Sequence, residues 1–206
     1  GAAGYIYFSG RDNEVTSVET PPMNKHVFLT KPYLFTVSYN RMTVRWITNK
    51  NSYCWIEYGE PGKDIQKVHA VSDGLVDANN RVHEIKLTGL KPGTTYEYKL
   101  IAKEIKDFQP YKLTYGEAIS SDVYSFTSFN PSAKETQWLV LNDIHDRPAS
   151  FQHLLQLNGN DPYQYVFLNG DMFDYQTNEK QIIDHLLTPC TESFATQKPR
   201  LFVRGN

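Results

Sequence analysis

The amino-acid sequence predicts an all-β sandwich followed by an incomplete α/β domain, because the spacing of apolar residues changes once along the chain. Residues 31–130 contain short segments of alternating apolar and polar side chains, separated by turn residues about every eight to twelve positions. Residues 131–206 contain continuous apolar runs separated by stretches with helical spacing, which is typical of a parallel sheet with helical crossovers. Residues 1–30 have little pattern, and we interpret them as a linker or an extra edge strand.

The composition is that of a folded chain without a strong electrostatic character. The 206 residues include 21 Lys and Arg and 23 Asp and Glu, which gives a formal net charge of -2. This balance gives no reason to expect nucleic acid or an anionic membrane as a partner. No apolar run approaches the roughly 20 residues of a membrane-spanning helix. Aromatic residues make up 14% of the chain, and this high share favours strands.

The sandwich is predicted from alternation and turn chemistry. Alternating apolar side chains occur in the segments 44–47, 54–58, 85–90, 96–100 and 124–126. Turn sequences lie between them at 60–62, 73–74 and 91–93. The segment Leu90–Tyr96 resembles the corner before strand F of fibronectin type III domains, where a Leu enters the core and a Tyr hydroxyl bonds to nearby backbone. This resemblance implies a fibronectin III-like or Ig-like sandwich over residues 31–130.

The second part of the chain alternates apolar runs with helical spacing. The runs Trp138–Leu141, Tyr165–Leu168 and Leu201–Val203 are expected to be strands buried on both faces. The stretches Pro148–Leu157 and Asn178–Leu187 are expected to be helices. This β-α-β-α-β order predicts a parallel sheet with right-handed crossovers. Because the third run ends close to the last residue, we expect the chain to be cut inside this domain.

A polar cluster follows each apolar run directly. The clusters are Asn142–Asp146, Asn169–Asp174 and Arg204–Asn206. Ligands of open α/β sheets bind beyond the carboxyl ends of the strands, so we expect side chains from all of the clusters to face one crevice. The candidate ligand residues are Asp143, His145, Asp171 and Asn206. Asp143 and His145 are two residues apart and would point the same way in extended backbone.

The donor types of these residues indicate a metal site. Carboxylate, imidazole and amide form a mixed set that suits Mn, Fe(II) or Zn. Acidic groups this close would repel one another without cations, and two divalent ions that share Asp171 would remove that repulsion. Gly170 and Gly205 permit the tight backbone that turns Asp171 and Asn206 inward. Each motif alone is common in turns and helix caps, so the specific signal is the ordered set.

Together the clusters resemble the first half of the calcineurin-like metallophosphoesterase signature. They read Asp-x-His at 143–145, Gly-Asp-x-x-Asp at 170–174 and Gly-Asn at 205–206. In that family the third block continues with His and an acidic residue, and two later His blocks complete the site. The resemblance covers about residues 137–206. The preceding sandwich is similar to the fibronectin-like domain that stands before the same catalytic fold in purple acid phosphatases.

This resemblance implies a site for two divalent metal ions (Mn, Fe or Zn). Asp143 and His145 would bind the first ion. Asp171 would bridge both ions, and Asn206 would bind the second. Whether Asn206 also contacts the substrate phosphate stays open. The ions would lower the pKa of a bridging water to give a hydroxide that attacks phosphorus. The implied activity is hydrolysis of a small-molecule phosphate monoester or diester.

Two further acidic residues accompany this set. By the resemblance, Asp174 would orient a neighbouring ligand His. Asp146 replaces the small residue that commonly follows Asp-x-His, and its role as a partner of the ligands or as a substrate-facing group stays open. Purple acid phosphatases have an iron-binding Tyr three positions after the bridging Asp and lack the first-block His. Here Asp174 occupies that position and Tyr175 follows it, so we expect a colourless Mn, Fe(II) or Zn centre.

The resemblance also limits what the chain is expected to do. The catalytic His of the family would follow Asn206, so we expect no catalytic residue within these 206 residues. We expect a fragment that is metal-free or binds metal weakly, with negligible turnover. The alternative is a non-catalytic binding or interaction protein that works through its β-sandwich and retains a remnant phosphoesterase half. Analogy to purple acid phosphatases favours a secreted or periplasmic protein. Substrate identity and oligomeric state stay open.

The remaining histidines and the cysteines are expected to be structural. His26, His69 and His83 should lie on the surface or in strand packing, and His153 and His185 should be exposed on helices. Cys54 and Cys190 are too few for a disulfide framework and too far apart in sequence for a metal pair.

Overall fold

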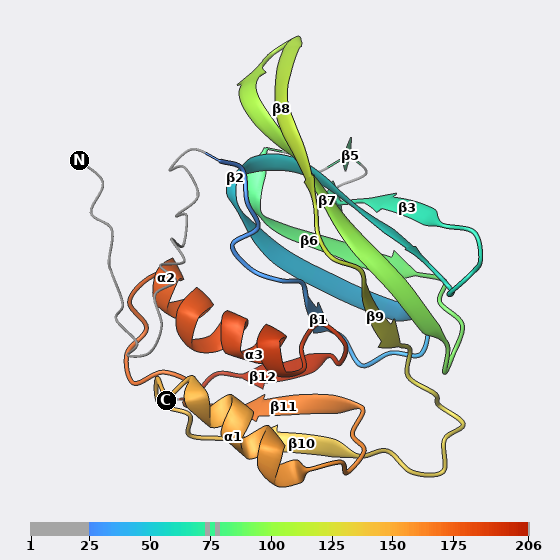
Figure 1. Cartoon of the computed structure of the whole chain (residues 1–206), viewed down its shortest axis with the longest axis vertical. Helices are drawn as coiled ribbons and strands as arrows, with labels where there is room; N and C mark the ends of the chain where they lie inside the picture. The colour runs from blue at the N-terminus through green and yellow to red at the C-terminus, as the bar shows by residue number, and fades with distance from the viewer. Residues whose placement is uncertain (1–24, 73–74, 77–78, 206) are drawn as a thin grey trace, which may run out of the picture.

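The computed structural model describes residues 25–72, 75–76 and 79–205. The described chain is mostly β, and two helical segments pack on one side of its C-terminal part (Figure 1). Most of the predicted linker, residues 1–30, lies outside the described residues, and so do the turn at 73–74 and the predicted ligand Asn206. No described helix has the length and apolar character that crossing a membrane requires.

One long strand organises the sandwich. The strands are β1 (Tyr33–Phe35), β2 (Arg41–Gly59), β3 (Gln66–His69), β6 (Asn80–Thr88), β7 (Thr95–Gln109), β8 (Lys112–Ser120) and β9 (Tyr124–Thr127). The first half of β2 pairs with β1 and β6, and its second half pairs with β3 and β7, all antiparallel. The register against β6 shifts between Ile47 and Ser52, where β2 passes from one layer to the other. A separate two-stranded sheet contains β4 (Val71–Ser72) and β5 (Leu75–Val76).

The core of the sandwich confirms the predicted alternation. Met42, Val44 and Trp46 are buried on one face of β2, and Leu90 is buried at the corner before β7. The hydroxyl of Tyr96 accepts a hydrogen bond from the backbone N–H of Lys91 at 2.8 Å. This is the backbone contact that the resemblance to the fibronectin corner implied.

The C-terminal part forms a parallel sheet that continues into the sandwich. Its elements are β10 (Trp138–Leu141), α1 (Ala149–Asn158), β11 (Tyr165–Asn169), α2 (Glu179–Ile182), the π-helical turn η1 (Ile183–Leu187), α3 (Thr188–Ser193) and β12 (Arg200–Val203). β11 pairs in parallel with β10 and with β12. β12 also pairs with β1, through Arg200 and Phe35, so the sheet order is β10-β11-β12-β1-β2.

The prediction that these strands are buried on both faces was wrong for the described residues. Leu141, Val166 and Leu168 pack beneath the helical segments in one hydrophobic cluster. The opposite face exposes about half of the side-chain surface of several apolar residues, namely Trp138, Val140 and Val203. Successive crossovers of the usual right-handed sense, taken in one direction across a sheet, place both helical segments on the same face.

The second helical segment is longer than the predicted Asn178–Leu187. Asn178 is its N-cap, and the Asn178 side chain accepts a hydrogen bond from the N–H of Gln181 at 2.9 Å. The chain stays helical through η1 to Ser193. Pro189 does not end the helix, because the π-helical turn before it shifts the backbone hydrogen bonds, as in the bond from the N–H of Thr188 to the carbonyl of Ile183.

Polar contacts join this helical segment to the sandwich. The hydroxyl of Tyr98 on β7 donates to the carbonyl of Thr196 at 2.6 Å in a buried position. The N–H of Leu34 donates to the carbonyl of Ala195 at 2.9 Å. These contacts fix the connection between α3 and β12 relative to the sandwich.

Candidate metal centre

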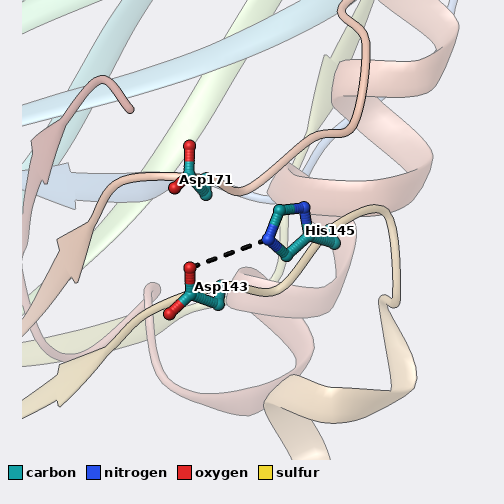
Figure 2. A group of neighbouring side chains, drawn as sticks. All are labelled: Asp143, His145 and Asp171. Carbon is teal, nitrogen blue, oxygen red and sulfur yellow. Dashed lines mark ion pairs between the residues drawn. The ribbon is translucent and has the colours of Figure 1, made fainter. Parts of the chain in front are cut away.

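Two loops at the carboxyl ends of neighbouring parallel strands bring three predicted ligands together. Asp143 and His145 follow β10, and Asp171 follows β11. One ligand atom from each of Asp143, His145 and Asp171 lies within 4.8 Å of the others. Figure 2 shows the three neighbouring side chains. The Nε2 atom of His145 is 3.6 Å from Oδ1 of Asp143. The fourth predicted ligand, Asn206, lies outside the described residues.

The backbone of both loops adopts a conformation that is unusual for side chains of this size. Asp143, His145, Asp146 and Asp171 have φ angles of 54°, 47°, 55° and 48°. A non-glycine residue in this left-handed region costs on the order of 1–3 kcal/mol when its surroundings hold it there. Asp143 and His145 therefore converge through left-handed turns, and the expectation of an extended backbone between them was wrong.

Backbone hydrogen bonds hold the two loops against each other. The N–H of His145 donates to the carbonyl of Asp171 at 3.0 Å, and the N–H of Asp146 donates to the carbonyl of Met172 at 3.0 Å. These bonds offset part of the strain and fix the positions of the ligand-bearing residues before any ion is present.

Gly205 makes a close approach to Asp171 possible. A Cβ atom at position 205 would lie 2.0 Å from Oδ1 of Asp171, which no side chain can tolerate. Gly170 has a φ of 81°, and a Cβ there would lie 3.2 Å from the Cα of Gly205. The two glycines therefore let the end of β12 pack directly on the loop that presents Asp171.

Asp174 sets the orientation of the His145 ring. The Nδ1 atom of His145 donates to Oδ1 of Asp174 at 2.9 Å. Because Nδ1 then holds the proton, the lone pair of Nε2 is directed toward Asp143 and Asp171. In this orientation Nε2 is the ring atom that is available to bind a cation.

Asp146 binds the second helical segment and the backbone of Asp174. Its carboxylate accepts from the N–H of Asp174 at 2.8 Å, from Nε2 of Gln181 at 2.8 Å and from Nδ1 of His185 at 2.9 Å. The bond from His185 is the main reason that the pKa of Asp146 lies below its ordinary value. Asp146 thus supports the loop that holds Asp174.

Gln181 and His185 were missed as parts of this site. His185 was expected to be exposed, and that was wrong, because it is half-buried and bonded to Asp146. His153 is exposed, as expected. Residues 181 and 185 are one helical turn apart, and this spacing was the available signal that both face the same neighbour.

Residues 32–128 match the family described as purple acid phosphatase, N-terminal domain. The comparison with curated proteins finds no match. The sandwich is therefore similar to the N-terminal domain of purple acid phosphatases.

Two solved structures are similar in fold. Purple acid phosphatase PPD1 from yellow lupin (Lupinus luteus) seeds has 18% identity and a TM-score of 0.62, over 85% of this chain and 34% of that chain. PhoD has 12% identity and a TM-score of 0.56, over 90% of this chain and 40% of that chain. This chain thus spans well under half the length of either protein. Both alignments extend beyond the sandwich, so the C-terminal part shares in the likeness of fold.

Proposed function

We propose that this chain is the sandwich and the first part of the catalytic domain of a metal-dependent phosphoesterase of the calcineurin-like type. In this proposal residues 131–206 begin an α/β domain, and the complete protein hydrolyses a small phosphate monoester or diester. The observation that supports it most is the convergence of Asp143, His145 and Asp171 within 4.8 Å at the ends of adjacent parallel strands.

The three residues fit a divalent cation in donor type and in access. Two carboxylates and one imidazole form a mixed oxygen and nitrogen set that suits Mn, Fe(II) or Zn. The side chains of Asp143 and His145 are 68% and 38% exposed, so an ion can reach them from solvent. We assign Asp143 and Nε2 of His145 to a first ion, Asp171 to a position between two ions, and Asn206 to the second.

The chain's own residues would prepare this site in three ways. Asp174 keeps the proton of His145 on Nδ1 and leaves Nε2 free to bind. Asp146 accepts a hydrogen bond from the backbone N–H of Asp174 and so fixes the backbone of that residue. The left-handed turns hold the ligands near one another, so little reorganisation is needed when an ion binds. The bound divalent ions would supply a Lewis acid for the phosphoryl oxygens and an activated water as nucleophile.

The proposed centre is colourless. A visible absorption band would need a tyrosinate bound to iron. Neither of the two residues at the corresponding place in the loop is assigned as such a ligand. Asp174 bonds to His145, and Tyr175 is 83% exposed. A visible absorption band in the iron-loaded full-length protein would contradict this part of the proposal.

A calorimetric titration tests metal binding directly. Mn²⁺ is titrated into the chelator-treated chain, into Asp171→Asn and into Asp161→Asn. Asp161 is exposed and lies away from the three ligands, so it matches the change in charge without touching the site. We expect Asp171→Asn to weaken binding at least about tenfold, and Asp161→Asn to leave it unchanged. Equal affinities of the two variants would overturn the proposal.

Localisation and substrate remain parts of the proposal. A secreted or periplasmic protein is compatible with its likeness to purple acid phosphatases. A cell-fractionation experiment that finds the complete protein only in the cytoplasm would contradict this placement.

A further inference from the structure

A large cavity adjoins the candidate metal centre on the side of the sandwich. Its volume is about 830 Å³, and Asp171 and Asp174 form one part of its wall. The floor comes from β1, β2 and β12, and the remaining wall comes from α2, η1 and the loop before them. Apolar side chains line much of the cavity, among them Phe173, Ile182, Leu186 and Phe202.

The guanidinium of Arg200 is buried in the wall of this cavity without full hydrogen bonding. Arg200 is the first residue of β12 and is only 5% exposed. Its Nε and Nη1 atoms are buried and have no hydrogen-bond partner among the described residues. Its Cζ lies 5.0 Å from the ring centre of Tyr33 and 5.1 Å from that of Phe35. The aromatic faces attract the cation but accept no hydrogen bonds in its plane.

No acidic side chain of the described residues pairs with this charge. Among the described residues no carboxylate oxygen lies within 4 Å of the Arg200 guanidinium, whereas Arg45 in the same cavity is paired with Glu84. Burial raises the pKa of the Cys190 thiol to about 11, although the charge of Arg200 and its side-chain hydrogen bond to this thiol lower it, so the thiol is neutral at physiological pH. Burial also raises the pKa of Tyr33.

A buried, unpaired guanidinium is unfavourable unless something compensates its charge and its donors. Removing a charge from water costs several kcal/mol, and each unsatisfied donor adds to this cost (on the order of 1–3 kcal/mol). A guanidinium attracts a carboxylate, phosphonate or phosphate group through its positive charge and its N–H donors. An anion in the cavity would therefore relieve a cost that the protein alone leaves in place.

We propose that this cavity is a binding subsite for an organic anion with an apolar body. The charged group pairs with Arg200, and the carbon skeleton lies against Phe173, Ile182 and Phe202. This inference rests on the proposed function. Because the cavity borders Asp171, the subsite holds the part of a phosphoester substrate that does not react. The substrate class is then a phosphoester whose organic portion is apolar and has a second anionic group.

The test uses phenylphosphonate as the probe and the chain without metal. Phenylphosphonate joins an anionic group to an apolar ring and cannot be hydrolysed as an ester. It is titrated in the presence of chelator into the wild type, Arg200→Met and Arg41→Met. Arg41 is exposed at the start of β2 and does not line the cavity, so Arg41→Met is the matched control. Inorganic phosphate and benzyl alcohol test the charge and the ring separately.

We expect the wild type and Arg41→Met to bind phenylphosphonate equally, and Arg200→Met to bind it about tenfold to hundredfold more weakly. Inorganic phosphate and benzyl alcohol should each bind more weakly than phenylphosphonate. Absence of phenylphosphonate binding by the wild type overturns the proposal whatever the variants do. Equal affinity of Arg200→Met and the wild type also overturns it. If Arg200→Met does not fold, Arg200→Lys replaces it and should lose part of the affinity.

Failure of this inference can be separated from failure of the proposed function. Asp143 is a proposed metal ligand that does not line the cavity. Asp143→Asn should therefore lose affinity for Mn²⁺ and keep its affinity for phenylphosphonate, whereas Arg200→Met should show the reverse. If Asp143→Asn loses both affinities in parallel, there is no separate subsite.

Discussion

The Cα of Gly205 faces Oδ1 of Asp171 so closely that a Cβ at position 205 would lie 2.0 Å from that oxygen. The end of β12 thus presses on the carboxylate that is proposed to lie between two ions. Any side chain at position 205 must displace Asp171, so the geometry of the candidate site depends on this glycine.

Gly205→Ala should weaken Mn²⁺ binding by at least about tenfold, because Asp171 must move away from Asp143 and His145. Overpacking by the new methyl group should also destabilise the fold by about 1–3 kcal/mol. The control is Gly116→Ala. Its new Cβ would meet the flexible ends of the Glu104 and Lys106 side chains, which can move aside. Calorimetry and urea unfolding measure the two effects. Unchanged metal affinity in Gly205→Ala would contradict the placement of Asp171 in the site.

Asp174→Ala should weaken metal binding roughly ten- to a hundredfold without removing a ligand, because the His145 ring loses the carboxylate that holds its proton on Nδ1. Calorimetry with Mn²⁺ measures the loss, and Asp161→Ala is the matched control. The NMR chemical shifts of the His145 ring nitrogens should also change, which a purely structural role of Asp174 would not require. An unchanged tautomer would contradict this assignment.

Acidification should destabilise the sandwich through His83. Burial, with a smaller contribution from His26, lowers the pKa of His83 from 6.5 to about 4. The ring is buried and stacks on Trp46, and its Nε2 atom lies 2.8 Å from Oγ1 of Thr48. Because the folded-state pKa is depressed, the stability contribution of neutral His83 is complete above pH 6.5 and is lost as the pH falls toward 4.

By pH 4.5 this loss should amount to roughly 2–3 kcal/mol. Urea unfolding of the wild type and of His83→Gln at pH 7 and pH 4.5 measures it. The variant has no group that titrates at this position, so its stability should fall less over the same interval. Parallel losses in both proteins would show that other groups cause the acid sensitivity.

Tyr98→Phe should destabilise the chain by about 1–2 kcal/mol, because the buried carbonyl of Thr196 loses its donor. Tyr39→Phe is the control, since Tyr39 is largely exposed. Chemical denaturation gives both values. If Tyr98→Phe is as stable as the control, the sandwich is not held to the α3–β12 connection by this bond.

Much of the fold could be predicted because it depends on local patterns. The buried Leu90 and the Tyr96 hydroxyl bond follow from turn chemistry within a few residues. The strands of the C-terminal part were found from their apolar runs within one or two residues. The exposure of Val140 was not predictable from the run itself, since an apolar run does not say what covers each face. The extension of the helix past Pro189 depends on the π-helical turn before it.

The candidate site was predictable in part for the same reason. Asp143, His145 and Asp171 stand at the ends of recognisable strands, and the topology of a parallel sheet brings strand ends together. The partners Gln181 and His185 come from a helix far along the chain, where only tertiary packing decides which neighbour they meet. The left-handed backbone of the ligand loops was likewise not predictable, because aspartate and histidine adopt it more often than most non-glycine residues but still only in a minority of positions.

Anomalous X-ray scattering from crystals soaked in Mn²⁺ tests the central claim most directly. The account predicts an anomalous peak between the carboxylates of Asp143 and Asp171 and within about 2.0–2.3 Å of Nε2 of His145. Anomalous density only at other positions, with these three side chains unligated at saturating Mn²⁺, would contradict the assignment of this site as a metal centre.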